Sequence, residues 1–292
     1  MSEKLQLNEI NSSLLRIANS LEKLNERQKK SEIFLTKSNC YFWENESKSL
    51  VAIDNIAFIE LSLLKGIDKT RDILMQNTKQ FASGFSANNA LLWGARGMGK
   101  SSLIKAVHAK ICNNDNQSGK RLILIEINRE DLVSLPHLMR SIAIINAQFL
   151  VFCDDLSFDK DETSYKSLKT ILDGGLEGRP KNMLFYATSN RRHIMARDMI
   201  DNEKSTAINP NEAVEEKISL SDRFGLWLGF HSCDQDTYLE MIRSYIDYYA
   251  VEIDDKTLKA KAIEWSMTRG ARSGRVAIQF VRQIAGEKKI AL

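Results

Sequence analysis

Short apolar runs recur along the middle of the chain, and polar or glycine-rich residues bound each of them. Apolar runs of this kind are typical of strands that are buried on both faces. Between them, apolar residues recur at helical spacing, as they do over residues 103–107. The pattern predicts strands that alternate with helices, which is an α/β fold. The predicted strands cover residues 90–93, 121–127, 149–155, 183–190 and 226–230.

The chain before these strands is expected to be mostly helical. Residues 1–30 predict one amphipathic helix, because apolar side chains alternate there at spacings of three and four. This seam could form a coiled coil with a partner or pack on the chain's own body, and the pattern leaves both open. We expect residues 37–50 to be a connector. Residues 56–81 read as two helical pieces, with Asp68 as a candidate cap of the second.

Further helices and one long loop are expected between and after the strands. Residues 131–139 predict a short helix interrupted by Pro136, and residues 164–172 predict another helix. The polar stretch 199–214 shows no period and is expected to be a long loop. From Asp234 onward the pattern is helical only, which suggests a separate small bundle.

Composition excludes several classes of protein. The chain has 292 residues, of which 43% are hydrophobic, as expected for a globular protein with a core. Its net charge of +3 is too small to indicate a nucleic-acid partner. The four cysteines and four histidines are scattered, so no disulfide framework or zinc site is indicated. Neither a secretory signal nor a membrane span is visible, so we expect a cytoplasmic protein.

The first predicted strand of the middle region leads directly into the motif G-x-x-x-x-G-K-[ST]. Its residues are Gly94, Ala95, Arg96, Gly97, Met98, Gly99, Lys100, Ser101 and Ser102. Glycines let the backbone curl with its N–H groups inward, and the following helix adds the positive end of its dipole. Lys100 would reach the β- and γ-phosphates of a nucleotide, and the Ser101 hydroxyl would bind Mg²⁺. The motif therefore predicts nucleotide binding.

Two carboxylates end the predicted strand at residues 149–155. Asp154 is the candidate that holds Mg²⁺ beside the phosphate loop. Asp155 is the candidate that orients and deprotonates the attacking water. Asn190 ends the next predicted strand and is the third catalytic candidate, because an amide there could sense the γ-phosphate.

Two clusters of cationic residues allow several interpretations. Arg191, Arg192 and His193 could face phosphate, nucleic acid or a neighbouring subunit, or be a solvated helix start. The junction 268–275 carries several arginines at a predicted helix N-terminus. Since the helix dipole does not favour cations there, an anionic partner would explain them.

In order along the chain, these motifs resemble the layout of AAA+ ATPases. The correspondence is Walker A at Gly94–Ser101, Walker B at Asp154–Asp155, sensor 1 at Asn190, the arginine finger at Arg223 and sensor 2 at Arg275. The resemblance is closer still to a bacterial AAA+ family catalogued mainly as a domain of unknown function. It covers residues 56–288 and rests on NALLWGARGMGKSSLIKA, DDLSF, SYKSLKTILDGGLEGRP, YATSNRRH, LSDRFGLWL and RSGRVAIQF.

The resemblance implies a three-layer P-loop NTPase fold of the AAA+ and ASCE type, with five parallel strands and a helical lid. It implies ATP and Mg²⁺ as ligands, and oligomers in which Arg223 completes a neighbour's site. Arg275 is preferred over Arg272 as the lid residue that contacts the nucleotide. The chain is also similar to the bacterial replication initiator and helicase-loader clade, whose members hydrolyse ATP with an aspartate at the position of Asp155.

We expect three parts: an N-terminal helical extension at 1–50, a nucleotide-binding α/β domain at 51–232 and a helical lid at 233–292. The expected function is a homo-oligomeric AAA+ ATPase that remodels or regulates a protein or nucleic-acid partner. One alternative is a nucleotide-gated scaffold with negligible turnover that recruits a protein through its N-terminal helix. Another is a nucleic-acid-associated ATPase that resembles a helicase loader. The sequence does not name the partner.

Overall fold

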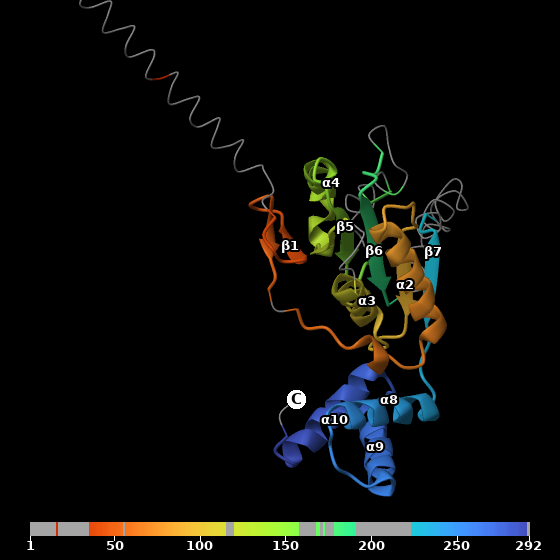
Figure 1. The fold of residues 1–292 in the computed structure, drawn as a ribbon. Helices are drawn as coiled ribbons and strands as arrows, with labels where there is room; N and C mark the ends of the chain where they lie inside the picture. Colours follow the sequence, from red (N-terminus) through yellow and green to blue (C-terminus); the bar gives the residue numbers. More distant parts are fainter. Residues whose placement is uncertain are drawn as a thin grey trace, which may run out of the picture.

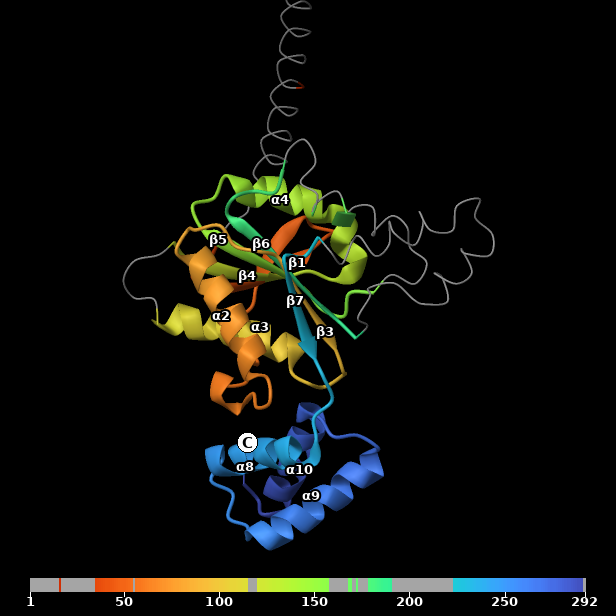
Figure 2. The same ribbon diagram turned by 90° about the vertical axis from the view of Figure 1, so that its right-hand side faces the viewer.

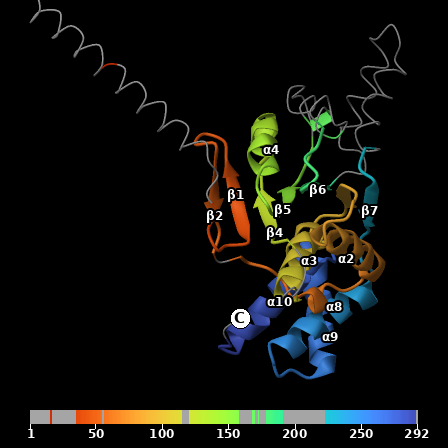
Figure 3. The ribbon, with the colours of Figure 1, turned by 45° about the horizontal axis from the view of Figure 1, so that its top comes forward.

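The computed structural model describes residues 16, 35–54, 56–114, 120–157, 168–169, 172, 178–190 and 223–290. Within these residues one sheet has the strand order β2-β1-β4-β5-β6-β3-β7 (Figure 1, Figure 3). Neighbouring strands run parallel except β1 and β2. The strands are β1 (Cys40–Glu44), β2 (Ser49–Ala52), β3 (Ala90–Gly94), β4 (Leu122–Glu126), β5 (Gln148–Cys153), β6 (Met183–Ser189) and β7 (Leu226–Phe230).

Helices cover both faces of this sheet, because the strands are apolar on both sides. Leu150 and Tyr186 belong to the hydrophobic cluster that contains the helices α2 and α3. Their neighbours Val151 and Phe185 pack on the opposite face, with the segment that contains η2 and α4. Figure 2 shows α2 and α3 on one side of the sheet and α4 on the other. The fold is a three-layer α/β fold, as predicted. The helices are α2 (Asp68–Ala82), α3 (Lys100–Asn114), η2 (Arg129–Ser134) and α4 (Leu135–Ala143).

The prediction that residues 37–50 form a connector is wrong. They include β1 and the start of β2, and β1 pairs with β4 at one side of the sheet. Trp43 is fully buried, and its Nε1 donates to Ser134 Oγ at 2.7 Å. The sheet therefore begins before residue 51. Over the part of the chain that the structure describes, it has six parallel strands and one antiparallel strand, where five parallel strands were expected.

Two helix starts also differ from prediction. Asp68 does not cap α2 but is its first residue, and it pairs with Arg71 at 2.6 Å. Before it, only the short helix η1 (Leu61–Leu63) forms in the predicted first helical piece. Pro136 lies in the first turn of α4 and does not interrupt a helix, because the N–H that proline lacks has no intrahelical partner there.

The chain ends in three helices that pack on one another beneath the sheet (Figure 1). They are α8 (Gln235–Tyr248), α9 (Asp255–Arg269) and α10 (Gly274–Glu287), and we call them the lid helices. The side chains of Asp234, Asp254 and Ser273 cap their N-termini. None of the helices in the described ranges is long and apolar enough to cross a bilayer.

Several predictions fall outside the described residues. They are the N-terminal helix apart from Arg16, most of the helix at 164–172, the cluster 191–193 and the loop 199–214.

Candidate functional site

The phosphate-loop motif forms the connection between β3 and α3, as its sequence context predicts. Gly94 has a φ of 125°, and a Cβ on it would lie 2.0 Å from the carbonyl oxygen of Phe230. Only glycine therefore lets β3 leave the sheet at this point. Gly97 also has a positive φ, of 74°, and α3 begins at Lys100. The turn presents backbone N–H groups at a helix N-terminus, which is the arrangement that binds phosphate.

Lys100 is buried, with 7% of its surface exposed, although it carries a charge. Its Nζ donates to Gly94 O and Ala95 O, each at 2.9 Å, and to Asn190 Oδ1 at 3.0 Å. Burial lowers the pKa of this ammonium group, while the nearby Asp154 acts in the opposite direction. A cation held in this way at the phosphate loop is suited to a polyphosphate.

Ser101 and Asp154 meet at the end of β5. Ser101 Oγ donates to Asp154 Oδ1 at 2.5 Å, and Thr188 Oγ1 donates to the same oxygen. No group of three or more His, Cys, Asp or Glu side chains that could hold a metal lies within the described part of the chain. Mg²⁺ is usually bound by one or two carboxylates together with substrate phosphates, and the pair of Ser101 and Asp154 beside the phosphate loop offers one carboxylate and a hydroxyl. Ser101 and Asp154 are thus the candidate Mg²⁺ ligands.

Asp155 and Asn190 also meet, although they follow different strands, β5 and β6. Asn190 Nδ2 donates to Asp155 Oδ1 at 2.6 Å, while its Oδ1 accepts from Lys100. The amide thus joins the phosphate-loop cation to the second carboxylate. Asp155 has a φ of 50°, in the left-handed region that is uncommon for residues other than glycine. Such outliers cluster at functional sites.

Arg275 reaches the site from the first turn of α10. Its backbone N–H donates to Gly97 O at 3.0 Å, so the lid contacts the phosphate loop directly. A Cβ on Gly97 would lie 2.9 Å from Ser273 Oγ and 3.0 Å from Arg275 Cβ. Arg272 does not line the cavity beside the phosphate loop, and its Nη2 donates to Gln235 Oε1 at 3.4 Å. The geometry favours Arg275 over Arg272 as the arginine that a nucleotide would meet.

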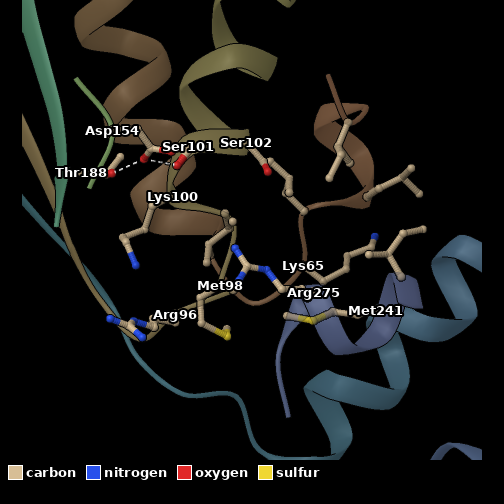
Figure 4. Close-up of a pocket in the computed structure, with 18 of the residues that line it drawn as sticks. Lys65, Arg96, Met98, Lys100, Ser101, Ser102, Asp154, Thr188, Met241 and Arg275 are labelled. Carbon is tan, nitrogen blue, oxygen red and sulfur yellow. Dashed lines mark hydrogen bonds between the residues drawn. The ribbon is translucent and has the colours of Figure 1, made fainter. Parts of the chain in front are cut away.

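These groups line one cavity of about 610 Å³ between the end of the sheet and the lid helices. In Figure 4, Arg275 and Met241 come from the lid, while Ser101, Asp154 and Thr188 lie on the side of the sheet. Arg96, Met98, Gly99 and Ser102 of the phosphate loop also line the cavity, together with Asp155 and Asn190.

Sequence reasoning missed three parts of the lining: Thr188, Lys65 and an apolar wall. Thr188 lies on β6, two residues before Asn190, and therefore points to the same side, a spacing that could have revealed it. No pattern within a single stretch of the sequence predicts the apolar wall, because its residues come from the segment before α2 and from the lid helices, which meet only in the folded chain. The wall consists of Ile59, Leu63, Leu64, Ile67, Met241, Tyr245 and Ile278.

Arg223 is not part of this cavity. It precedes β7, and that strand runs parallel to β3, whose C-terminal end leads into the phosphate loop. The site lies at the C-terminal ends of the parallel strands, whereas Arg223 lies before the N-terminal end of β7. The five residues of β7, about 17 Å of extended chain, therefore separate Arg223 from the end of the sheet that carries the site.

A known structure shares this fold. The Aeropyrum pernix Orc1 protein in complex with DNA is similar, with a TM-score of 0.57 and 12% sequence identity over 81% of this chain and 66% of that one. This chain thus spans just under two thirds of the Orc1 chain. The Orc2 protein of the same organism, in ADPNP and ADP complexes, gives a TM-score of 0.44 at 11% identity, over 80% of this chain and 70% of that one. The Thermotoga maritima RuvB Holliday junction branch migration motor gives a TM-score of 0.44 at 12% identity, over 76% of this chain and 71% of that one.

At such low identity the likeness to Orc1 concerns the fold alone, and that fold is the AAA+ P-loop NTPase fold. The comparison with curated proteins found no match. A family model described as "Protein of unknown function (DUF815)" matches residues 36–288, which include all seven strands, the three lid helices and the whole lining of the cavity. The chain therefore belongs to the DUF815 family.

Proposed function

We propose that this protein is an ATPase that binds ATP with Mg²⁺ in the cavity between the sheet and the lid helices. It hydrolyses the nucleotide within a homo-oligomer and uses the cycle to remodel or regulate a protein or nucleic-acid partner. The observation that carries the proposal is the convergence of Lys100, Ser101, Asp154, Asp155 and Asn190 on one cavity. These residues come from three separate stretches of the chain, so their meeting is a property of the fold.

The lining of the cavity suits a nucleoside triphosphate. One part of its lining is the phosphate loop with the cations Lys100, Arg96 and Arg275, which match a polyphosphate. Another part is the apolar wall, with the ring of Tyr245 and the side chain of Met241. A flat, largely apolar base would be buried there, as ligand pockets generally bury an apolar ligand surface.

Each polar residue then has a role in hydrolysis. The ammonium of Lys100 and the backbone N–H groups of the loop hold the β- and γ-phosphates. Bound Mg²⁺, held by Ser101 and Asp154, would neutralise the charge that develops on the phosphate oxygens. Asp155 accepts a proton from the attacking water, and Asn190 fixes the carboxylate of Asp155 through the 2.6 Å hydrogen bond.

Arg223 is proposed to act on a neighbouring subunit. Its place towards the N-terminal ends of the parallel strands, opposite the cavity, supports this, because the chain's own site is out of its reach. An arginine that reaches the transferred phosphate from a second subunit stabilises transition-state charge, and its loss lowers turnover by about 10³- to 10⁵-fold in related systems. Hydrolysis would therefore depend on assembly.

Two variants test the division of roles. We expect Lys100→Ala to abolish both nucleotide binding and turnover, because it removes the buried cation at the phosphates. Arg223→Ala is expected to bind the nucleotide like the unchanged chain and to release phosphate at least about 10³-fold more slowly. Calorimetric titration with a slowly hydrolysed ATP analogue measures binding, and steady-state phosphate release measures turnover. Equal loss of binding in both variants would contradict the proposal.

The same assays separate the ATPase from a scaffold that is only gated by nucleotide. A chain that binds ATP and assembles, yet releases no phosphate above background, would be such a scaffold. A nucleic-acid partner is tested separately by titration with DNA at low and moderate salt, since phosphate contacts make affinity strongly salt-dependent. Binding that is absent at low salt would leave a protein partner as the remaining class.

A further inference from the structure

Thr188 lies on β6 with only 1% of its surface exposed, directly behind the two carboxylates of the candidate metal site. Its hydroxyl makes one hydrogen bond in each direction. Thr188 Oγ1 donates to Asp154 Oδ1 and accepts from the backbone N–H of Asp155 at 3.0 Å. Figure 4 shows the chain of contacts from Thr188 through Asp154 to Ser101. One buried hydroxyl therefore holds both of the residues that follow β5.

The first of these bonds fixes one oxygen of Asp154. Asp154 Oδ1 accepts from Thr188 Oγ1, from Ser101 Oγ at 2.5 Å and from the N–H of Asp155 at 3.1 Å. Asp154 Oδ2 accepts no hydrogen bond from the residues that the structure describes. The carboxylate is thus anchored through Oδ1 and offers Oδ2 to a cation or its water shell. Among the described residues, Thr188 supplies the only buried side-chain anchor of Asp154, since Ser101 is itself a candidate ligand.

The second bond supports the unusual backbone of Asp155. Its φ of 50° places this residue in the left-handed region, which must be held by its surroundings. Thr188 holds it from both sides, because the hydroxyl accepts from Asp155 N and Thr188 O accepts from Leu156 N at 2.7 Å. This conformation brings Asp155 Oδ1 within 2.6 Å of Asn190 Nδ2.

We propose that Thr188 is a positioning residue of the Mg²⁺ site, whose hydroxyl sets the orientation of Asp154 and the peptide of Asp155. The proposal rests on the proposed function and extends it to a residue that acts through Asp154 and Asp155. Its specific consequence is a link between Thr188 and the metal-dependent part of nucleotide affinity. Partners that orient metal ligands typically contribute about 10- to 100-fold to metal affinity.

The test compares nucleotide affinity with and without Mg²⁺. The probe is a fluorescent N-methylanthraniloyl derivative of ATP, titrated into the full chain in Mg²⁺ and again in EDTA. The ratio of the two dissociation constants reports the contribution of the metal. Thr188→Val, which keeps the shape and removes the hydroxyl, is expected to reduce this ratio about 10-fold or more and to leave the affinity in EDTA unchanged. Thr188→Ser, which restores the hydroxyl, is expected to recover most of it.

Thr78→Val is the matched control. Thr78 is also fully buried, but its hydroxyl bonds to Leu74 O at 2.7 Å and to the Tyr186 hydroxyl at 2.8 Å, away from the carboxylates. Its loss is expected to lower stability without changing the Mg²⁺ ratio. Thermal unfolding of all variants identifies any that fail to fold.

The outcomes are distinct. A Thr188→Val protein with the Mg²⁺ ratio of the unchanged chain would overturn the proposal, and so would an equal loss in Thr78→Val. Should Thr188→Val not fold, a folded Thr188→Ser protein that has lost the Mg²⁺ ratio would overturn it, while one that retains the ratio would support it. Failure of the unchanged chain to bind the probe in either buffer would overturn the proposed function itself.

Discussion

Buried polar residues in this protein serve either the site or the core, and His108 shows the second case. It lies on α3 with 2% of its surface exposed, its Nε2 is 3.2 Å from Leu122 O, and its Nδ1 is 3.7 Å from Cys40 Sγ. Burial lowers the pKa of this imidazole to about 4. Since Nε2 faces a carbonyl, it carries the proton, and the neutral ring fits its neighbours.

This pKa predicts a loss of stability in mild acid. The unfolded chain binds a proton at His108 below about pH 6.5, whereas the folded chain does so only near pH 4. Stability is therefore complete above the unfolded pKa and falls as the pH drops towards the folded one. Between about pH 7 and about pH 5.5, the free energy of unfolding should fall by about 1 kcal/mol more in the unchanged chain than in His108→Gln.

Urea denaturation at the two pH values measures this difference. Because both proteins share every other titrating group, only the difference between their pH dependences is attributed to His108. Parallel pH profiles for the two proteins would show that the imidazole is not responsible.

At the scale of elements, the phosphate loop and α10 are in direct contact. Arg275 N donates to Gly97 O, and Ser273 caps α10 while lying against Gly97. Gly274 is part of the same contact, because a Cβ there would lie 3.2 Å from Gly97 O. The first turn of the lid helix thus fixes the position of a phosphate-loop carbonyl.

Gly274→Ala tests this contact, and Gly286→Ala is its control. Both glycines belong to α10, but a Cβ at Gly286 would meet nothing within 4 Å. We expect Gly286→Ala to raise the free energy of unfolding by up to about 1 kcal/mol through helix propensity, with unchanged nucleotide affinity. Gly274→Ala should displace Gly97 O and weaken nucleotide binding about tenfold. Equal affinities in the two variants, measured by titration with the fluorescent nucleotide, would argue against coupling between loop and lid.

Some elements of the fold and of the site could be predicted from the sequence, and others could not. Central strands such as β5 were predictable because both faces are buried and the whole run is apolar. The hairpin of β1 and β2 was not, because these strands are short and mix buried, partly buried and exposed positions, such as Val51, without a regular pattern. The phosphate loop and Asp154 were predictable from local patterns. The apolar wall of the cavity was not, since residues near Leu64 and near Tyr245 become neighbours only through folding.

On the scale of the whole molecule, the site lies at the C-terminal ends of the parallel strands and Arg223 lies towards their N-terminal ends. The cavity lies where the phosphate loop, the end of β5 and the lid meet, whereas Arg223 precedes β7. A single chain therefore presents a site and, elsewhere, the arginine proposed to complete such a site. Copies that assemble head to tail would bring the two together, and such heterologous contacts close into rings when the rotation allows it.

Mixing two inactive variants tests this arrangement. Lys100→Ala retains Arg223 but cannot hold a nucleotide, while Arg223→Ala retains an intact cavity. Random co-assembly at equal amounts gives an intact cavity facing an intact arginine at about a quarter of the interfaces, so about a quarter of the unchanged turnover should return. The control mixture pairs Arg223→Ala with the double variant Lys100→Ala/Arg223→Ala and should stay inactive. Because the first mixture contains no chain with both residues, recovered phosphate release requires Arg223 to act on another subunit. If a mixture that is shown to exchange subunits releases no phosphate, Arg223 does not act on a neighbour's site.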